Sequence, residues 1–271
     1  MGGGGLRGTQ ILGVPVVKVA ILAGGLGTRL QERTVDVPKP MIQIGGHPIL
    51  WHIMRIFAHH GFEQFVIALG YKKEVINSYF LNFVAYADRL SIRPGEGYQV
   101  QAAQPESQWL VDLLDTGLHT ETGGRLQRVA EFIGDETFIL TYGDGVSNVN
   151  IPDLVRFHKN HGRLATVTAV RPPARFGHLT MDNARVARFG EKQQMDEGWI
   201  NGGFFVLEPG VAKYLHGDET VFEQEPLENL AKDGQLMAYR HDGFWACMDT
   251  LRDVNRLDAL WNSGAAPWMQ W

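Results

Sequence analysis

The sequence predicts a three-layer α/β fold with a mostly parallel, mixed central sheet. Three observations lead to this prediction. Short apolar runs alternate along the chain with segments of helical periodicity, the order expected of parallel strands joined by helices. The runs are almost continuously apolar and rich in β-branched residues, as in strands buried on both faces of a sheet. The chain has 271 residues, which is long enough for one large domain of this class.

The first half of the chain contains three predicted strands and three predicted helices. Pro48 begins one helix and Gly61 ends it, while Gly134 ends another. The stretch 84–120 is the least readable, apart from a strand near its end. The predicted elements, in order, are a strand at 16–22, a helix at 48–61, a strand at 64–70, a helix at 72–83, a strand at 109–117 and a helix at 123–134.

The second half continues the alternation and closes the domain. Its predicted elements are a strand at 137–145 that runs into a turn, a helix at 151–162, strands at 164–170 and 201–210, a helix at 223–234, strands at 235–241 and 244–250, and a helix at 251–264. No repeat, linker or low-complexity segment interrupts this order. We therefore predict a flexible tail over 1–15 and a single domain over 16–271.

Composition limits the partners of the chain. A net charge of -5 argues against a nucleic-acid polymer as partner. The single cysteine excludes an intramolecular disulfide and suits a reducing compartment. No apolar stretch reaches the length of a transmembrane helix. We expect a cytoplasmic protein that acts on small molecules, with no membrane partner.

A glycine-rich segment follows the first predicted strand. Its glycines are Gly24, Gly25 and Gly27. They can bring backbone N–H groups close to a ligand because no Cβ intervenes. Arg29 and the later Lys39 supply positive charge for phosphate oxygens. Neither a Walker loop nor a dinucleotide fingerprint fits, since Leu30 occupies the place of a small residue. We predict a third kind of phosphate loop; a glycine-rich turn with surface charges is the alternative.

Two aspartates follow apolar runs in the second half. Asp144 lies in "YGDG" and Asp249 in "MDT". Ligands bind outside the carboxyl ends of strands in open α/β sheets, and Mg²⁺ favours carboxylate oxygens. The two aspartates therefore form a predicted Mg²⁺ site. The alternatives are a hairpin turn at Asp144 and a helix N-cap at Asp249.

A polar segment near residue 200 is the candidate for binding a sugar phosphate. Glu191 and Asn201 can bond to sugar hydroxyls, and Lys192 can neutralise a phosphate. Gly202 and Gly203 would let a flat sugar ring lie against the backbone. An exposed charged loop is the alternative interpretation.

Other chemically distinctive residues are assigned no role. Cys247 lies in an apolar run and is predicted to be inert. His158 and His161 share a helical face, but no third metal ligand is evident in the sequence. No arrangement of serine, histidine and aspartate suggests a hydrolase.

The chain resembles the sugar-phosphate nucleotidylyltransferases. Their signature is similar to "LAGGLGTRLQERT" followed by "PKPM". Further segments resemble the branch that transfers a cytidylyl group to glucose 1-phosphate: "GGHPILWHIM", "VDLLDTG", "TGGRLQRVAEFI", "FILTYGDG", "INGGFFVLEPG", "EQEPL", "MDTLRD" and "APW". The resemblance covers residues 18–271. The chain departs from the family in its extra tail and in lacking the proline that often follows the Glu191–Lys192 pair.

The resemblance implies a fold type, substrates and residue roles. The fold would be of the Rossmann-like nucleotidyltransferase, or GT-A-like, type. The triphosphate of CTP would be held by Leu22, Ala23, Gly24, Gly25, Gly27, Thr28, Arg29 and Lys39. The cytosine and ribose would lie near Thr116, Arg125 and Gly143, and Asp144 and Asp249 would hold Mg²⁺. Glucose 1-phosphate would face Glu191, Lys192, Asn201, Gly202 and Gly203.

The reaction that follows is in-line attack of the sugar phosphate on the α-phosphorus of CTP, which releases CDP-glucose and pyrophosphate. Arg29, Lys39, Asp144 and Asp249 would be the catalytic residues, because phosphoryl-type transfer needs positioning and charge stabilisation. The resemblance further implies a homo-oligomer whose product serves dideoxysugar and O-antigen synthesis. Thymidylyl or uridylyl transfer to the same sugar, a non-catalytic nucleotide-sugar-binding relative and a glycosyltransferase remain alternatives.

Overall fold

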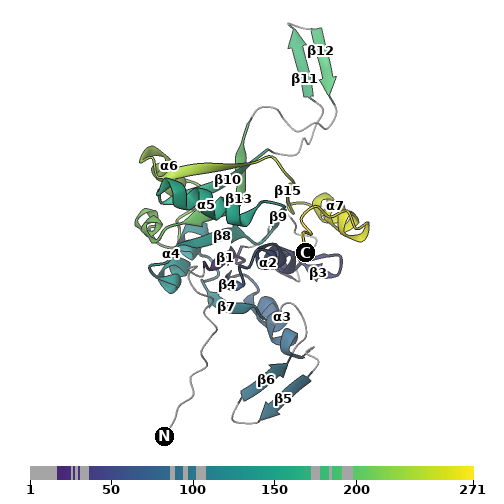
Figure 1. Ribbon diagram of the computed structural model, residues 1–271, viewed down its shortest axis with the longest axis vertical. Helices are drawn as coiled ribbons and strands as arrows, with labels where there is room; N and C mark the ends of the chain where they lie inside the picture. Colours follow the sequence, from purple (N-terminus) through teal and green to yellow (C-terminus); the bar gives the residue numbers. More distant parts are fainter. Residues whose placement is uncertain are drawn as a thin grey trace.

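A seven-stranded mixed sheet forms the centre of the protein (Figure 1). The computed structural model describes residues 17–25, 27, 30, 37–85, 89–93, 97–101, 108–171, 178–182, 185–190 and 198–271. The strand order is β14-β10-β13-β8-β1-β4-β7. The strands are β1 (Val19–Leu22), β4 (Gln64–Leu69), β7 (Leu110–Asp115), β8 (Phe138–Tyr142), β10 (Ala165–Val170), β13 (Ile200–Leu207) and β14 (Leu236–His241).

Most neighbouring strands of this sheet are parallel. Strand β13 alone runs antiparallel to its neighbours β10 and β8, and the other four neighbouring pairs are parallel. The prediction of a mostly parallel, mixed sheet is therefore confirmed. The parallel run β8-β1-β4-β7 brings four carboxyl ends to one edge, where the candidate site lies.

Helices cover both faces of the sheet. They are α2 (Ile49–His59), α3 (Lys73–Ala85), α4 (Thr122–Ile133), α5 (Ile151–His161), α6 (Glu225–Lys232) and α7 (Leu251–Asn262). The described part of the chain also contains the short 3₁₀ helices η2 (Lys39–Met41) and η4 (Pro209–Tyr214). Each predicted helix is present, although the one predicted at 223–234 begins at Glu225.

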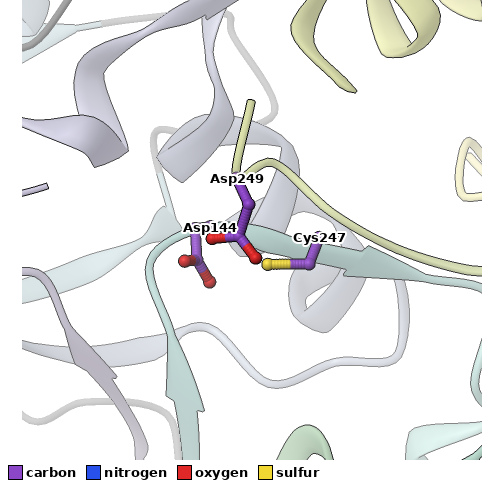
Figure 2. Close-up of side chains that lie close together, drawn as sticks. All are labelled: Asp144, Cys247 and Asp249. Carbon is purple, nitrogen blue, oxygen red and sulfur yellow. The ribbon is translucent and has the colours of Figure 1, made fainter. Parts of the chain in front are cut away.

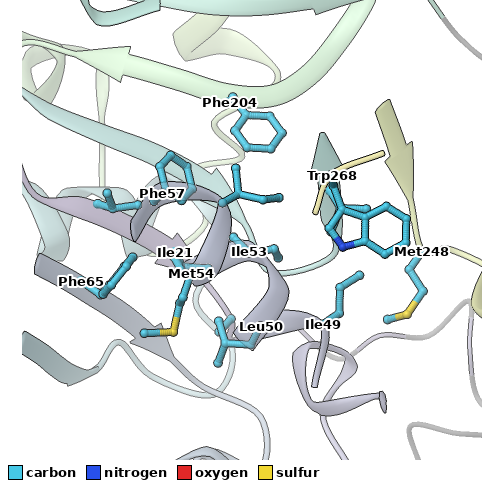
Figure 3. Close-up of a cluster of buried hydrophobic side chains, with 14 of the residues drawn as sticks. Ile21, Ile49, Leu50, Ile53, Met54, Phe57, Phe65, Phe204, Met248 and Trp268 are labelled. Carbon is cyan, nitrogen blue, oxygen red and sulfur yellow. The ribbon is translucent and has the colours of Figure 1, made fainter. Parts of the chain in front are cut away.

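Alternation along the strands divides the core into two layers. In β8, Phe138 and Leu140 pack with α4 and α6, whereas Ile139 belongs to the layer of α2, α5 and α7. Phe57, from α2, lies against Phe204, from β13, with ring centroids 5.9 Å apart (Figure 3). Trp268, near the C-terminus, is 1% exposed and belongs to the same layer. The three-layer arrangement is thus confirmed.

Four two-stranded ladders add to the central sheet. They pair β2 (Gln43–Ile44) with β3 (His47–Pro48), β5 (Arg89–Arg93) with β6 (Gly97–Gln101), β9 (Gly145–Ser147) with β15 (Trp245–Cys247), and β11 (His178–Asp182) with β12 (Arg185–Gly190). Sequence patterning missed all of these except β15. The predicted strand at 244–250 exists, but it pairs with β9 and not within the central sheet.

The helices that the structure describes include none that combines the length and apolar character needed to cross a bilayer.

A buried histidine makes the core sensitive to acid. His52 is fully buried on α2; its Nε2 lies 2.8 Å from the carbonyl of Ile44, and its Nδ1 accepts from Trp268 at 3.3 Å. Both bonds suit a neutral ring. Burial, together with nearby His47 and against the opposing carbonyl bond of Ile44, lowers the pKa of His52 to about 4.

We expect the unfolding free energy to fall as the pH drops from about 6.5 to about 4. In this range His52 is protonated in the unfolded chain but stays neutral in the folded chain. The full effect of this group is on the order of 3 kcal/mol. Urea unfolding of wild type and His52→Gln across this range measures it. The variant should show a shallower pH dependence of the unfolding free energy; equal slopes would contradict the assignment to His52.

Candidate active site

The candidate site lies at the carboxyl edge of the parallel strands. The glycine segment follows β1 and is held to both neighbours: Ala23 N donates to Ala68 at 3.0 Å, and Gly143 N donates to Leu22 at 3.0 Å. Tyr71 N also donates to the carbonyl of Gly24 at 3.1 Å. These backbone bonds fix Leu22, Ala23 and Gly24 between β4 and β8. Gly25 and Gly27 follow; Thr28 and Arg29 lie outside the described residues.

Lys39, Asp144 and Asp249 meet in one cluster. The Lys39 ammonium donates to Asp144 Oδ2 at 2.5 Å and to Asp249 Oδ1 at 2.8 Å. The three side chains are 14%, 24% and 20% exposed, respectively. Asp144 is 105 positions and Asp249 is 210 positions from Lys39, so the fold brings together three distant segments of the chain. The predicted convergence of the two aspartates is therefore present in the structure.

A short ladder brings the two aspartates together. Strand β15 pairs antiparallel with β9, with Cys247 opposite Gly145, and Met248 N donates to the carbonyl of Asp144 at 2.9 Å. Asp144 lies in the turn between β8 and β9, but this turn is not the hairpin of the alternative interpretation, because β8 pairs with β1 and β13 and β9 pairs with β15. The turn and the charged cluster coexist, because the turn leaves the carboxylate facing Lys39.

Asp249 is not the cap of the last helix. Thr250 is the N-cap of α7, and it forms a capping box with Asp253. The carboxylate of the preceding Asp249 is therefore not used as the cap, and it accepts a hydrogen bond from Lys39. The N-cap interpretation of Asp249 is wrong.

Opposing electrostatic effects act on Lys39. Burial by itself lowers the pKa of this ammonium, but the charge and hydrogen bonds of Asp144 and Asp249 together raise it above its ordinary value. Lys39 is therefore a fixed positive charge. It holds the two carboxylates in place and leaves their remaining lone pairs for another cation or for donors.

Cys247 lies beside the two carboxylates, which sequence patterning did not foresee. Ligand atoms of Asp144, Cys247 and Asp249 all lie within 4.8 Å of one another, and the thiol points toward Asp249 (Figure 2). Burial, followed by the charge of Asp144, raises the pKa of this thiol, so it is protonated at neutral pH. The two carboxylates supply the hard oxygen ligands that a divalent cation such as Mg²⁺ prefers. The donor set therefore fits a divalent metal.

Pro40 packs closely against Gly143 beside the cluster. A Cβ at Gly143 would lie 2.7 Å from Pro40 Cγ and 3.1 Å from the carbonyl of Leu22. Only glycine leaves room for this contact, which seats η2 against the end of β8. The proline beside Lys39 thus helps to position its ammonium.

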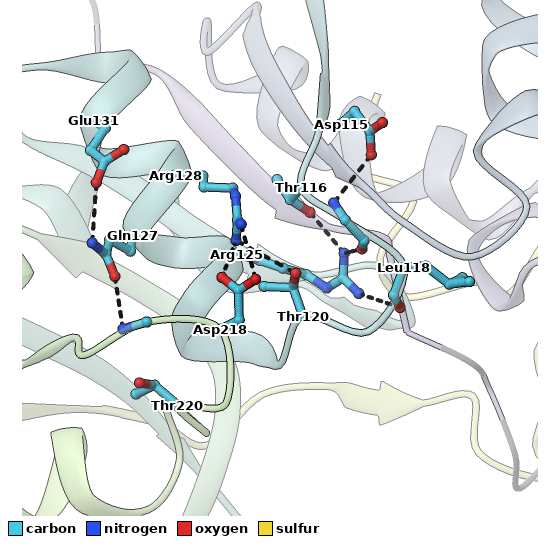
Figure 4. A network of polar contacts seen from close by, with 12 residues as sticks. Asp115, Thr116, Leu118, Thr120, Arg125, Gln127, Arg128, Glu131, Asp218 and Thr220 are labelled. Carbon is cyan, nitrogen blue, oxygen red and sulfur yellow. Dashed lines mark hydrogen bonds and ion pairs between the residues drawn. The ribbon is translucent and has the colours of Figure 1, made fainter.

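Arg125 holds the glycine segment to the ends of β4 and β7 (Figure 4). Its guanidinium is 4% exposed and donates to four carbonyls and one hydroxyl. The acceptors are Leu69 O, Thr116 Oγ1, Gly117 O, Gly24 O and Leu118 O. Gly24 must be glycine here, since a Cβ would lie 2.2 Å from Nη1 of Arg125. The predicted nucleotide-binding residues Thr116 and Arg125 are therefore in contact with each other and with the glycine segment.

Replacement of Arg125 by methionine should destabilise the fold and weaken nucleotide binding together. Four carbonyls would each lose one donor; Tyr71 N still bonds Gly24 and Thr116 N still bonds Leu69, but the carbonyls of Gly117 and Leu118 lose the guanidinium, and we expect a cost of about 3 kcal/mol of unfolding free energy. Urea unfolding and calorimetric titration with CTP measure the two effects. Arg128→Met is the matched control: Arg128 lies on the same helix, but its partner Asp218 is at the surface. An equal response of both variants would contradict the fastening role.

The predicted sugar side has a packing role in addition to any binding role. Gly203 has φ +78, and a Cβ there would lie 2.7 Å from the ring of Tyr142. Asn201 Oδ1 accepts from Gly203 N at 2.7 Å, and the Trp245 indole donates to the carbonyl of Gly202 at 2.7 Å. Glu191 and Lys192 lie outside the described residues, so their positions relative to Asn201 stay predictions.

Comparisons with known proteins show the family of the chain. The family model described as nucleotidyl transferase matches residues 18–265. A glucose-1-phosphate cytidylyltransferase of Salmonella typhi is 49% identical over 256 residues, which cover 94% of this chain and 100% of that enzyme. A probable glucose-1-phosphate cytidylyltransferase of Bacillus subtilis is 46% identical over the same shares.

Solved structures share the fold at lower identity. The structure of HddC from Yersinia pseudotuberculosis has a TM-score of 0.67 at 24% identity, covering 90% of this chain and 99% of that one. A UDP-glucose pyrophosphorylase complexed with UDP-glucose has a TM-score of 0.66 at 16% identity, covering 92% and 100%. Both share the α/β fold of this chain. On the family match and the full-length relatives, the chain belongs to the nucleotidyl transferase family, in its glucose-1-phosphate cytidylyltransferase branch.

Proposed function

We propose that this protein joins CTP and glucose 1-phosphate to give CDP-glucose and pyrophosphate. The observation that carries the proposal is the cluster of Lys39, Asp144 and Asp249 at the carboxyl edge of the sheet. It places one fixed ammonium and two carboxylates beside the glycine segment that follows β1. The choice of substrates is supported by the names of the relatives at 46–49% identity.

The chemistry requires positioning and charge stabilisation but no strong general base. A phosphate oxygen of glucose 1-phosphate, ionised at neutral pH, attacks the α-phosphorus of CTP. The new P–O bond forms as the bond from the α-phosphorus to the bridging oxygen breaks, and pyrophosphate leaves with that electron pair. Bound Mg²⁺ would neutralise the phosphate charge that builds up in this transfer.

The residues have complementary roles in this proposal. Asp144 and Asp249 would hold the divalent ion with their carboxylate oxygens. Lys39 orients the two carboxylates and faces the triphosphate with its charge. The amides of the glycine segment and the predicted Arg29 take the phosphate oxygens, and Arg125 keeps the segment at a fixed distance from β4 and β7.

Base selection is proposed to depend on the Thr116–Arg125 region. Cytosine presents an N4 donor and an N3 acceptor, the reverse of the thymine and uracil edges. The carbonyls of Gly117 and Leu118 already accept from Arg125 and have a second lone pair available. They are candidates for the N4 acceptor.

The test is direct. The purified protein is incubated with glucose 1-phosphate, Mg²⁺ and each of CTP, dTTP, UTP, ATP and GTP, and pyrophosphate and the nucleotide sugar are both measured. We expect CTP to be preferred. Preferred use of dTTP or UTP would move the protein to the alternative thymidylyl or uridylyl activity, and no turnover with any nucleotide would favour a binding relative. A cytoplasmic homo-oligomer that serves O-antigen and dideoxysugar synthesis is part of the same proposal.

A further inference from the structure

We propose that Cys247 makes the divalent-metal site a high-affinity site for thiophilic cations such as Zn²⁺ and Cd²⁺, which bind Cys247 together with Asp144 and Asp249 and block nucleotidyl transfer. This inference rests on the proposed function only for its inhibitory consequence. Binding itself depends on the three side chains alone. The sequence alone assigns Cys247 no role.

The geometry brings three ligand atoms to one point. The thiol sulfur and one oxygen from each carboxylate lie within 4.8 Å of one another, and all three residues are partly accessible. Two ligands of one zinc ion lie about 3–4 Å apart, given zinc–oxygen and zinc–sulfur bonds of about 2.0 and 2.3 Å. Rotations that move these atoms by about 1 Å therefore suffice. The β9–β15 ladder, which pairs Cys247 with Gly145, keeps the ligands on a rigid frame.

The donor set distinguishes soft cations from hard ones. Mg²⁺ takes oxygen ligands and keeps several waters, so it uses the two carboxylates and leaves the thiol protonated. Zn²⁺ and Cd²⁺ gain a third, soft ligand when the thiol proton is released to solvent and the sulfur–metal bond forms. Two carboxylates and one thiolate balance the charge of such an ion and of Lys39. The same residues thus bind soft ions more tightly than the ion proposed for catalysis.

Inhibition follows from the place of the ion. A cation held by three protein ligands has fewer positions open to phosphate oxygens than one held by two. It also lies where the catalytic ion is proposed to bind, so the two compete. Soft cations should therefore inhibit at concentrations far below those of Mg²⁺.

The test follows the ultraviolet charge-transfer absorption of a cadmium–thiolate bond in the full-length protein. Because the chain has a single cysteine, any such band reports on Cys247. We expect a band that saturates at one Cd²⁺ per chain and is displaced by excess Mg²⁺ with CTP. Asp144→Asn and Asp249→Asn keep the thiol but remove a carboxylate, and each should weaken Cd²⁺ binding at least tenfold. Asp218→Asn, a surface control, should leave it unchanged.

A second measurement separates binding from folding defects. In Cys247→Ala, half-inhibition by Zn²⁺, relative to that variant's own activity, should need at least tenfold more metal. A cadmium band of equal affinity in wild type and both aspartate variants would overturn the proposal, since Cys247 would then bind metal alone. An inactive wild type that still shows the three-ligand band would count against the proposed function and support this inference.

Discussion

Replacement of Asp249 by asparagine is expected to lower kcat for CDP-glucose formation by about 10³-fold, the size of effect seen when one charge-stabilising group is lost. The amide has nearly the same shape but lacks the negative charge that holds a divalent cation. It also removes one of the two carboxylates that Lys39 bonds, at 2.8 Å. The loss should be only partly recovered at high Mg²⁺.

Steady-state kinetics across a range of Mg²⁺ concentrations measures this effect. Asp258→Asn is the control, because Asp258 lies on α7, the helix that follows Asp249, and accepts from the backbone N–H of Gly45, away from the cluster. Its kcat should stay close to that of wild type. An Asp249→Asn enzyme with wild-type kcat and Mg²⁺ dependence would remove Asp249 from the metal site.

Replacement of Lys39 by methionine is expected to separate metal binding from catalysis. Without the ammonium, two half-buried carboxylates lose the cation that both of them bond, so the unfolding free energy should fall by about 2–4 kcal/mol in the absence of metal. Mn²⁺ should bind the free variant more tightly than wild type, because a competing positive charge is gone. Turnover should nevertheless fall by roughly 10²–10³-fold, since the charge facing the triphosphate is lost.

Electron paramagnetic resonance of Mn²⁺, urea unfolding and kinetics measure the three effects. Lys18→Met is the matched control: Lys18 pairs with the largely exposed Glu136 at the surface, and its loss should change none of them appreciably. Weaker Mn²⁺ binding in Lys39→Met, or unchanged turnover, would contradict the role given to Lys39.

The sheet could be predicted because strands buried on both faces consist almost entirely of apolar residues, and such runs are visible in the sequence. The apolar run at 64–70, predicted as a buried strand, is β4 in the structure, and β4 is buried along nearly its whole length. Ligands bind beyond the carboxyl ends of parallel strands, and this rule predicted that Asp144 and the glycine segment lie at the binding edge of the sheet. Both lie at that edge.

The contacts within the site could not be predicted, because they depend on pairing between distant segments. Strand β15 is only three residues long, and no local pattern shows that it pairs with β9. That pairing moves Cys247 from an apolar run to the side of two carboxylates. Likewise, Lys39 was assigned to the phosphate loop by its charge alone, whereas its bonds to both aspartates arise from η2 lying against Gly143.

The central claim is that Asp144 and Asp249 share one divalent cation beside Lys39. A crystal structure of the protein grown with CTP and Mn²⁺, with anomalous data collected to locate the manganese, tests it most directly. We expect an anomalous peak bonded to one oxygen of each aspartate and to a phosphate of the nucleotide. Manganese bound to the nucleotide elsewhere, with the Lys39 ammonium still joined to both carboxylates, would contradict it.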